Sequence, residues 1–172
     1  MPEPLPEPWL RGPLPDLDPT IAPVLFAFQQ AREDLDKHTE GLSPDQIWLR
    51  PHGLTPLGFH LRHIAGSVDR LATYLLDRQL SDTQIASLRC EMDSGASREQ
   101  LLESIRQSFD SAERVIRSTA PRALPEPRFV GRQRLPTTVA GLMIHLAEHT
   151  QRHVGQAIGA AKLVRSLSNP VV

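Results

Sequence analysis

Five of the seven histidines fall in two short stretches of the sequence. The stretch HLAEHTQRHVGQ carries His145, His149 and His153, one at every fourth residue. On an α-helix this spacing puts successive imidazoles one turn apart, about 6 Å along the axis. Two such imidazoles can bind one Zn, Ni, Cu or Fe ion, and a third ligand from elsewhere would leave a coordination position open for water or substrate. His60 and His63, in FHLRHIAG, are the candidates for that third ligand.

The spacing alone leaves a structural explanation open. Histidines on a helix are often satisfied by backbone carbonyls, and a cluster of perturbed histidines need not be functional. A glutamate base between the two ligands would strengthen the metal hypothesis, as in the HExxH motif of zinc proteases. Here Thr150, Gln151 and Arg152 separate His149 from His153, which disfavours a metalloprotease.

Amphipathic helices would carry both histidine stretches. Thr55-Pro56 begins a segment whose apolar residues recur three and four positions apart, which predicts the buried face of a bundle helix: Leu57, Leu61, Ile64, Val68, Leu71 and Leu75. A last helix is expected from about Thr138 to Arg165, and its apolar arc includes His153.

Two further long helices are expected. The first begins at the cap Thr20, with Pro23 in its opening turn, and stops at Gly41. The sequence SREQ at 97–100 is a capping box that opens another helix. The pattern also occurs in SPDQ at 43–46, before a short turn, and in SDTQ at 81–84.

Two segments lack a helical pattern. Residues 121–136 contain four prolines and the arginines at 122, 128, 132 and 134 against one acid, and we expect a basic loop there. Eight of the sixteen prolines lie in residues 1–23, so the start of the chain is expected to be extended. The sequence thus predicts an all-α four-helix bundle, with a Pro-rich N-terminal extension at 1–19 and the bundle domain at 20–168.

Composition excludes several classes of protein. A length of 172 residues fits one domain, and 19 basic against 20 acidic residues argue against a nucleic-acid partner. The single cysteine, Cys90, permits neither an intrachain disulfide nor a four-cysteine zinc site, and we expect it to be inert. The acidic, Pro-rich start does not have the pattern of a secretory signal, and no segment approaches the ~20 apolar residues of a membrane span. We therefore expect a cytoplasmic protein with no membrane partner.

Two segments resemble one known family, the DinB-like or YfiT-like metal-binding four-helix bundles, which include thiol-dependent transferases. They are TPLGFHLRHIAGSVDRL, similar to the family's second helix with its single ligand histidine, and LPTTVAGLMIHLAEHTQRHVGQ, similar to its final-helix histidine pair. The resemblance covers most of residues 20–165. Position by position, it implies metal ligation by His63, His149 and His153, with Gln156 closing the pattern.

The resemblance and the helical periodicity disagree about the second helix. At about 100° per residue, His63 falls about 120° from the centre of the apolar arc and His60 only about 60° from it. Periodicity therefore favours His60 as the ligand. We follow the resemblance, because bundle helices often bury more than one stripe, and regard His60 and His145 as neighbours of the site.

The resemblance also implies an activity. The expected cofactor is a divalent transition metal, zinc or nickel before iron, and the expected reaction conjugates a small thiol to a small electrophile. The basic loop would attract an anionic thiol or substrate, and a homodimer is expected. The alternatives are a metal-dependent hydrolase and a non-catalytic metal-binding stress or structural protein.

Four other residues carry expectations about their surroundings. Gly155 and Gly159 cost a helix roughly 1 kcal/mol each relative to alanine, which suggests a close neighbouring backbone, with a simply weakened helix as the alternative. Glu148 is expected to be solvated, and Asp69 to pair with Arg70 or water.

Overall fold

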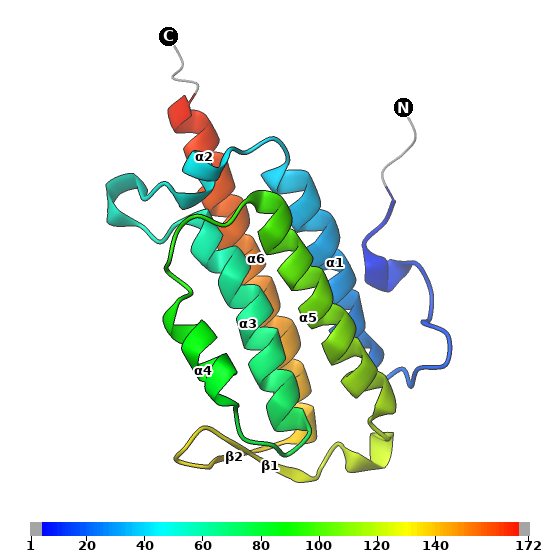
Figure 1. Ribbon diagram of the computed structural model, residues 1–172. Coiled ribbons are helices and arrows are strands. Elements are labelled where there is room, and N and C mark those ends of the chain that lie inside the picture. The colour runs from blue at the N-terminus through cyan, green and yellow to red at the C-terminus, as the bar shows by residue number, and fades with distance from the viewer. Residues whose placement is uncertain (1–4, 169–172) are drawn as a thin grey trace.

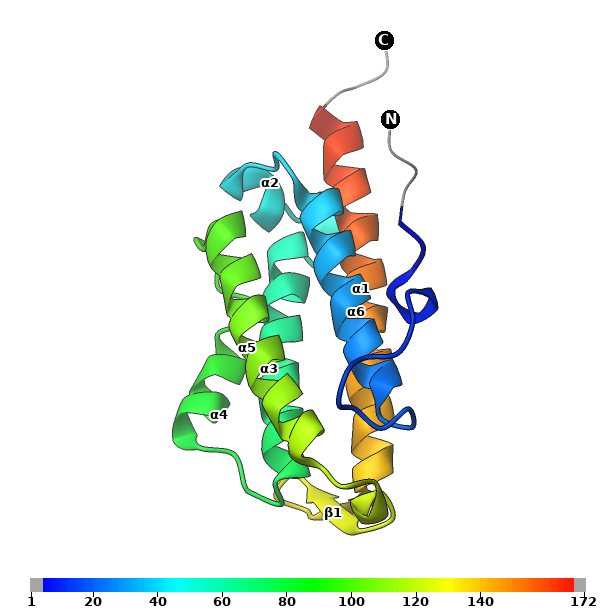
Figure 2. The same cartoon turned by 90° about the vertical axis from the view of Figure 1, so that its right-hand side faces the viewer.

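Four long helices form a bundle in the computed structural model, which describes residues 5–168, and the second and third of them run in the same direction (Figures 1 and 2). They are α1 (Ala22–Thr39), α3 (Leu57–Leu75), α5 (Arg98–Ser118) and α6 (Val139–Ser168). Helix α3 packs against both α5 and α6, and α1 packs against α6 and α5, which closes the ring of four. The predicted all-α four-helix bundle is confirmed.

Short elements connect the long helices. They are α2 (Pro44–Trp48), α4 (Asp82–Arg89) and the 3-10 turns η1 (Pro8–Leu10), η2 (Pro51–Gly53) and η3 (Pro121–Ala123). The three predicted capping boxes are present at the starts of α2, α4 and α5, where a serine accepts a hydrogen bond from the backbone of the glutamine three residues later. These caps satisfy backbone donors that would otherwise lack partners, and they fix where each helix begins.

The interior is apolar and continuous from α1 to α6. Phe28 of α1 and Phe109 of α5 stack at its centre, with ring centroids 4.3 Å apart. All the apolar positions predicted for α3 are buried except Leu71, which is half-buried. Within residues 5–168, no helix combines the length and apolar character that crossing a bilayer requires.

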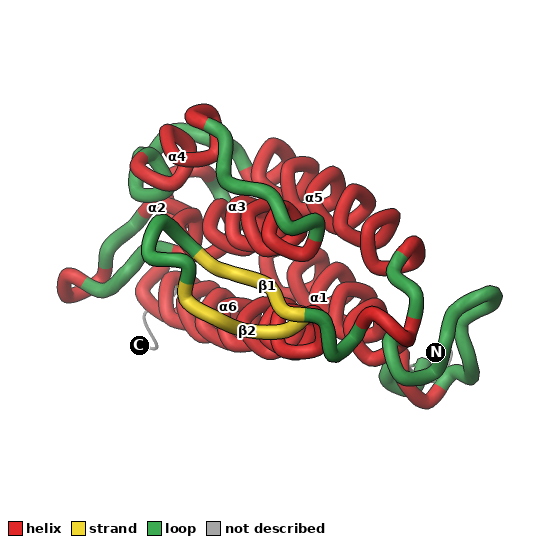
Figure 3. The backbone as a smooth tube through the Cα atoms, turned by 90° about the horizontal axis from the view of Figure 1, so that it is seen from below, coloured by secondary structure: helices red, strands yellow, loops and turns green. Residues whose placement is uncertain are grey.

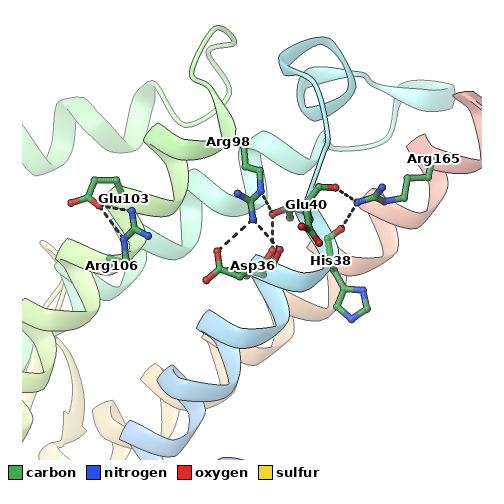
Figure 4. Close-up of polar contacts among 9 residues, drawn as sticks. Asp36, His38, Glu40, Arg98, Glu103, Arg106 and Arg165 are labelled. Carbon is green, nitrogen blue, oxygen red and sulfur yellow. Dashed lines mark hydrogen bonds and ion pairs between the residues drawn. The ribbon is translucent and has the colours of Figure 1, made fainter. Parts of the chain in front are cut away.

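Polar contacts tie the end of α1 to two other helices (Figure 4). The Arg98 guanidinium, at the start of α5, donates to the Asp36 carbonyl at 2.9 Å and lies 3.4 Å from its carboxylate. Arg165 of α6 donates to the carbonyls of His38 and Glu40. These bonds satisfy carbonyls at the C-terminus of α1 that have no partner within the helix.

The prediction of a loop at residues 121–136 is wrong in its second half. A β-hairpin joins α5 to α6, with β1 (Pro127–Val130) antiparallel to β2 (Leu135–Thr138) (Figure 3). Phe129 pairs with Pro136 in its register. Strands of four residues are too short for a clear period-two pattern, and the prolines in this segment argued against strands.

The first helix begins later than predicted. Thr20 is not its cap, because its own amide and hydroxyl both donate to the Asp18 carboxylate. The helix starts at Ala22, after Ile21, and no side chain caps it. The last helix matches the predicted start, where Thr138 Oγ1 accepts from the Gly141 amide at 3.0 Å, but extends to Ser168.

Candidate metal centre

Three imidazoles converge between α3 and α6. His63 is on α3, and His149 and His153 are one turn apart on α6. His63 Nε2 lies 3.0 Å from His149 Nε2, and the His153 ring centroid lies 4.3 Å from that of His63 and 4.7 Å from that of His149. One nitrogen from each ring lies within 4.8 Å of the other two. The structure thus brings together the three histidines that the sequence resemblance selects.

The geometry fits a transition-metal ion. Two nitrogens bound tetrahedrally to one zinc ion, each about 2.05 Å from it, are about 3.3 Å apart. The 3.0 Å separation of the His63 and His149 Nε2 atoms is close to that value. His149 Nδ1 is buried and has no hydrogen-bond partner within residues 5–168, so this ring meets the cluster through Nε2.

The rings are held in the form that binds metals. Burial, followed by the positive charge that His63 carries when it is protonated, lowers the pKa of His149. The same two causes, in the same order, lower the pKa of His153 to about 4. Both imidazoles are therefore neutral at neutral pH, and only a neutral imidazole offers a lone pair to a metal ion.

A buried carboxylate orients His63. His63 Nδ1 donates to Glu91 Oε2 at 2.7 Å, which leaves the lone pair of His63 on Nε2, facing His149. Glu91 is only 4% exposed, and its other oxygen lies 2.8 Å from Arg70 Nη1. Burial alone would raise the pKa of Glu91, but the His63 hydrogen bond and the Arg70 charge bring it below its ordinary value. Glu91 is thus an ionised acceptor.

The segment carrying Glu91 is fixed by contacts on both sides. The Arg62 guanidinium donates to the carbonyls of Cys90 and Asp93 and lies 4.8 Å from the Trp48 ring centroid. Trp48 Nε1 in turn donates to the Ala96 carbonyl at 2.8 Å. Sequence reasoning missed Glu91, because nothing in its neighbourhood in the sequence separates it from a surface acid.

Gly66 provides the space for the Arg70–Glu91 ion pair. A Cβ atom at Gly66 would lie 2.7 Å from Arg70 Nη1 and 2.8 Å from Glu91 Oε1. We expect Gly66→Ala to lower the free energy of unfolding by about 1–3 kcal/mol, measured by urea denaturation, because the buried pair must shift. The control is Gly155→Ala, on α6, where no atom lies within 4 Å and the helix should gain roughly 1 kcal/mol. Equal effects of the two substitutions would contradict this explanation.

His60 is the inner neighbour of the cluster. It is 7% exposed, and its Nδ1 lies 3.2 Å from His153 Nδ1. Helical periodicity favoured His60 as a ligand. The place of a residue within the apolar arc, however, indicates how deeply the residue is buried, and not which neighbouring helix it faces. His63 lies at the edge of the apolar arc of α3, and this edge faces α6. Ligation by His63 stays a prediction, and the geometry favours it over ligation by His60.

Phe59 forms an apolar wall beside the three rings. Its ring stacks on that of His63, with centroids 5.3 Å apart and planes inclined by 16°. It meets His60 and His153 edge-on, at 5.4 and 6.4 Å. This wall lowers the local polarity and strengthens electrostatic interactions at the cluster.

The metal-free protein should lose stability as the pH falls from 6.5 towards 5. Burial and the charge of His63 lower the pKa of His60 to about 4, and the pKa of His153 is also about 4, against 6.5 in an unfolded chain. In this window the unfolded chain binds protons that the folded chain does not, so stability decreases with falling pH, by at most about 1.4 kcal/mol per pH unit for each group. Urea denaturation in EDTA would measure it, and a flat profile would contradict it. The variant His60→Leu/His153→Gln should lose most of the slope.

Two polar residues near the cluster have partners of their own. His145 Nδ1 lies 2.7 Å from Glu148 Oε1, and the other carboxylate oxygen pairs with Arg152. His145 and Glu148 could form a second group with His149, but this group is more exposed than the first. Glu148 is only half-exposed and both of its oxygens are paired, so it is less freely solvated than expected.

Two other expectations, the Asp69–Arg70 pair and the close backbone approach at Gly155 and Gly159, are wrong. Asp69 accepts from Gln84 Nε2 at 2.7 Å, whereas Arg70 pairs with Glu91. No neighbouring atom lies within 4 Å of the Cβ position of Gly155 or Gly159, so neither glycine packs closely against the backbone of another element.

The basic segment is partly neutralised. Arg128 donates to the Leu75 carbonyl and pairs with Glu126, and the Arg134 guanidinium lies 4.4 Å from the Phe129 ring centroid. The hairpin therefore presents less free positive charge than the sequence suggests.

Comparison with known proteins gives the family. The chain matches the DinB superfamily over residues 27–157, a range that includes all three clustered histidines and most of the bundle. No curated protein matches the chain. The match covers well over half of the chain and agrees with the helical fold and the histidine cluster, so this protein belongs to the DinB superfamily.

Proposed function

We propose that this protein binds a divalent transition metal through His63, His149 and His153. The proposal rests on the convergence of three imidazoles from two helices, with one nitrogen of each within 4.8 Å of the others. Two of these imidazoles, His149 and His153, are neutral, and a hydrogen bond orients the third, His63. Imidazole ligands suit zinc and nickel best here, and iron is the next candidate. By its hydrogen bond to His63, Glu91 would fix the tautomer of a ligand, as carboxylates commonly do at zinc sites.

We propose further that the site transfers a small thiol to a small electrophile. Within residues 5–168, the cluster contains three side chains, and three protein ligands are typical of catalytic sites with one open position. When bound, the metal would favour the thiolate form of a thiol at that position. The thiol proton would pass to water, the thiolate sulfur would form a bond to the electrophilic carbon, and the leaving group would depart with its electron pair. Phe59 would limit the access of water to the reacting atoms.

Two alternatives have less support. A hydrolase needs a general base for water, but the carboxylates nearest the cluster are engaged: Glu91 with His63 and Arg70, and Glu148 with His145 and Arg152. A purely structural metal site would be expected to have a fourth protein ligand. We expect the protein to act in the cytoplasm, where small thiols are kept reduced.

Metal analysis followed by a thiol panel tests the proposal. The purified protein would be analysed for bound metal, and the zinc-loaded and chelator-treated forms incubated with monobromobimane and cysteine, coenzyme A or glutathione. Conjugation releases bromide and forms a fluorescent thioether, so the rate is read directly. We expect faster conjugation of at least one thiol by the loaded form. Metal binding without metal-dependent conjugation would favour the non-catalytic alternative.

A further inference from the structure

A cleft of about 410 Å³ lies beside the histidine cluster, between α6 and the segment that precedes α3. Leu49 and Leu54 line it from that segment, and Leu163 and Val164 line it from α6. Thr55 and Gln156 contribute polar groups, and none of the lining residues is an aspartate, glutamate, lysine or arginine. The cleft therefore favours an uncharged, mainly apolar molecule.

A glycine keeps this cleft open. Gly159 lines it from the interior of α6, where glycine costs roughly 1 kcal/mol relative to alanine. No neighbouring atom lies within 4 Å of its Cβ position, so packing against another element does not explain the glycine. Any larger side chain at this position would reduce the volume available to a ligand.

His60 offers the cleft a hydrogen-bond donor. It is 93% buried and lines the cleft, and within residues 5–168 its Nε2 makes no hydrogen bond. Its Nδ1 faces His153 Nδ1 at 3.2 Å, so one of these nitrogens donates and the other accepts. If His153 uses Nε2 to bind a metal, its Nδ1 carries the proton and donates. His60 then accepts at Nδ1 and carries its own proton on Nε2.

We propose that this cleft binds a small, uncharged, mainly apolar molecule with an oxygen acceptor, which receives a hydrogen bond from His60 Nε2. The molecule would be the electrophile of the proposed transfer, with the rings of His60 and His153 between its acceptor and the metal position. The donor assignment of His60 rests on the proposed metal function, through the tautomer of His153, whereas the shape and charge of the cleft do not depend on it.

Binding of two matched probes tests this proposal on the full chain. Acetophenone is uncharged and carries a carbonyl acceptor, and benzoate has the same ring and a similar size but a negative charge. Titrations followed by amide chemical shifts should show acetophenone binding at least tenfold more tightly, with the largest shifts at Gln156 and Gly159. Equal affinities for acetophenone and benzoate, or chemical-shift changes confined to other parts of the chain, would overturn the proposal. This test needs no variant.

Three variants separate the cleft from its surroundings. Gly159→Leu should weaken acetophenone binding at least tenfold, whereas Gly155→Leu should leave it unchanged, because Gly155 has the same open surroundings but does not line the cleft. His60→Leu keeps an apolar wall without the donor and should weaken acetophenone binding at least threefold. Full binding by Gly159→Leu would overturn the cleft assignment, and full binding by His60→Leu would overturn the donor assignment.

Zinc affinity, measured on the same samples, keeps the two proposals distinguishable. Gly159→Leu should bind zinc as the parent protein does, because Gly159 is not part of the histidine cluster. A parent protein that binds acetophenone in the cleft but takes up no zinc would support the cleft and refute the metal function. A parent protein that binds zinc but prefers benzoate would do the reverse.

Discussion

Replacing His149 with alanine is expected to lower the affinity for zinc at least a hundredfold. His149 Nε2 lies 3.0 Å from His63 Nε2 at the centre of the cluster, and one ligand of a zinc site contributes about 3 kcal/mol, a quarter of the binding free energy of a four-ligand site. Competition with a fluorescent zinc chelator would measure the change. Zinc-dependent thermal stabilisation should decrease in parallel, because a ligand stabilises the fold according to its affinity.

His145→Ala is the matched control for that experiment. His145 is one turn from His149 on the same helix, is exposed, and is bonded to Glu148 rather than directed into the cluster. We expect this variant to retain zinc affinity within severalfold. A similar loss from both substitutions would mean that zinc binds at the exposed group of His145, Glu148 and His149 instead.

The choice between His60 and His63 is settled by the same assay. His63→Ala should reduce zinc affinity as strongly as His149→Ala, whereas His60→Ala should have a smaller effect, because His60 contacts a ligand and is not itself in the cluster. Retention of zinc by His63→Ala would refute the assignment.

Replacing Glu91 with alanine is expected to lower the free energy of unfolding by about 3–5 kcal/mol. The substitution leaves the Arg70 guanidinium, whose residue is 8% exposed, buried without its ionic partner. For a domain of this size each kcal/mol corresponds to roughly 2–4 °C, so the melting temperature should fall by roughly 6–20 °C. Differential scanning calorimetry of the metal-free protein measures this effect apart from metal binding.

Two further variants identify the cause. Glu91→Ala/Arg70→Met removes both charges and should recover much of the lost stability. Glu91→Gln keeps an acceptor for His63 Nδ1 without the charge, and should lower zinc affinity by about 10–100-fold. A stable Glu91→Ala variant with unchanged zinc affinity would show that Glu91 neither supports the fold nor orients His63.

Local patterns predicted most of the helical framework correctly. The three capping boxes begin α2, α4 and α5, and the apolar spacing of α3 corresponds to a buried face. These features depend on hydrogen bonds and side-chain contacts within a few residues, so the sequence shows them directly. The hairpin after α5 was missed, because its stability depends on pairing between two strands that are individually too short to recognise.

The amino-acid sequence by itself determined which histidines were candidates to bind a metal, since helical spacing placed His145, His149 and His153 at successive turns of one helix. Only the tertiary structure decided which residues support them, because Glu91 reaches His63 from a loop 28 residues away and the cleft beside His60 is formed by distant segments. Spacing fixes neighbours along one helix. The packing of α3 against α6, and of the loop after α4 against α3, fixes neighbours across helices, and no local pattern encodes those distances.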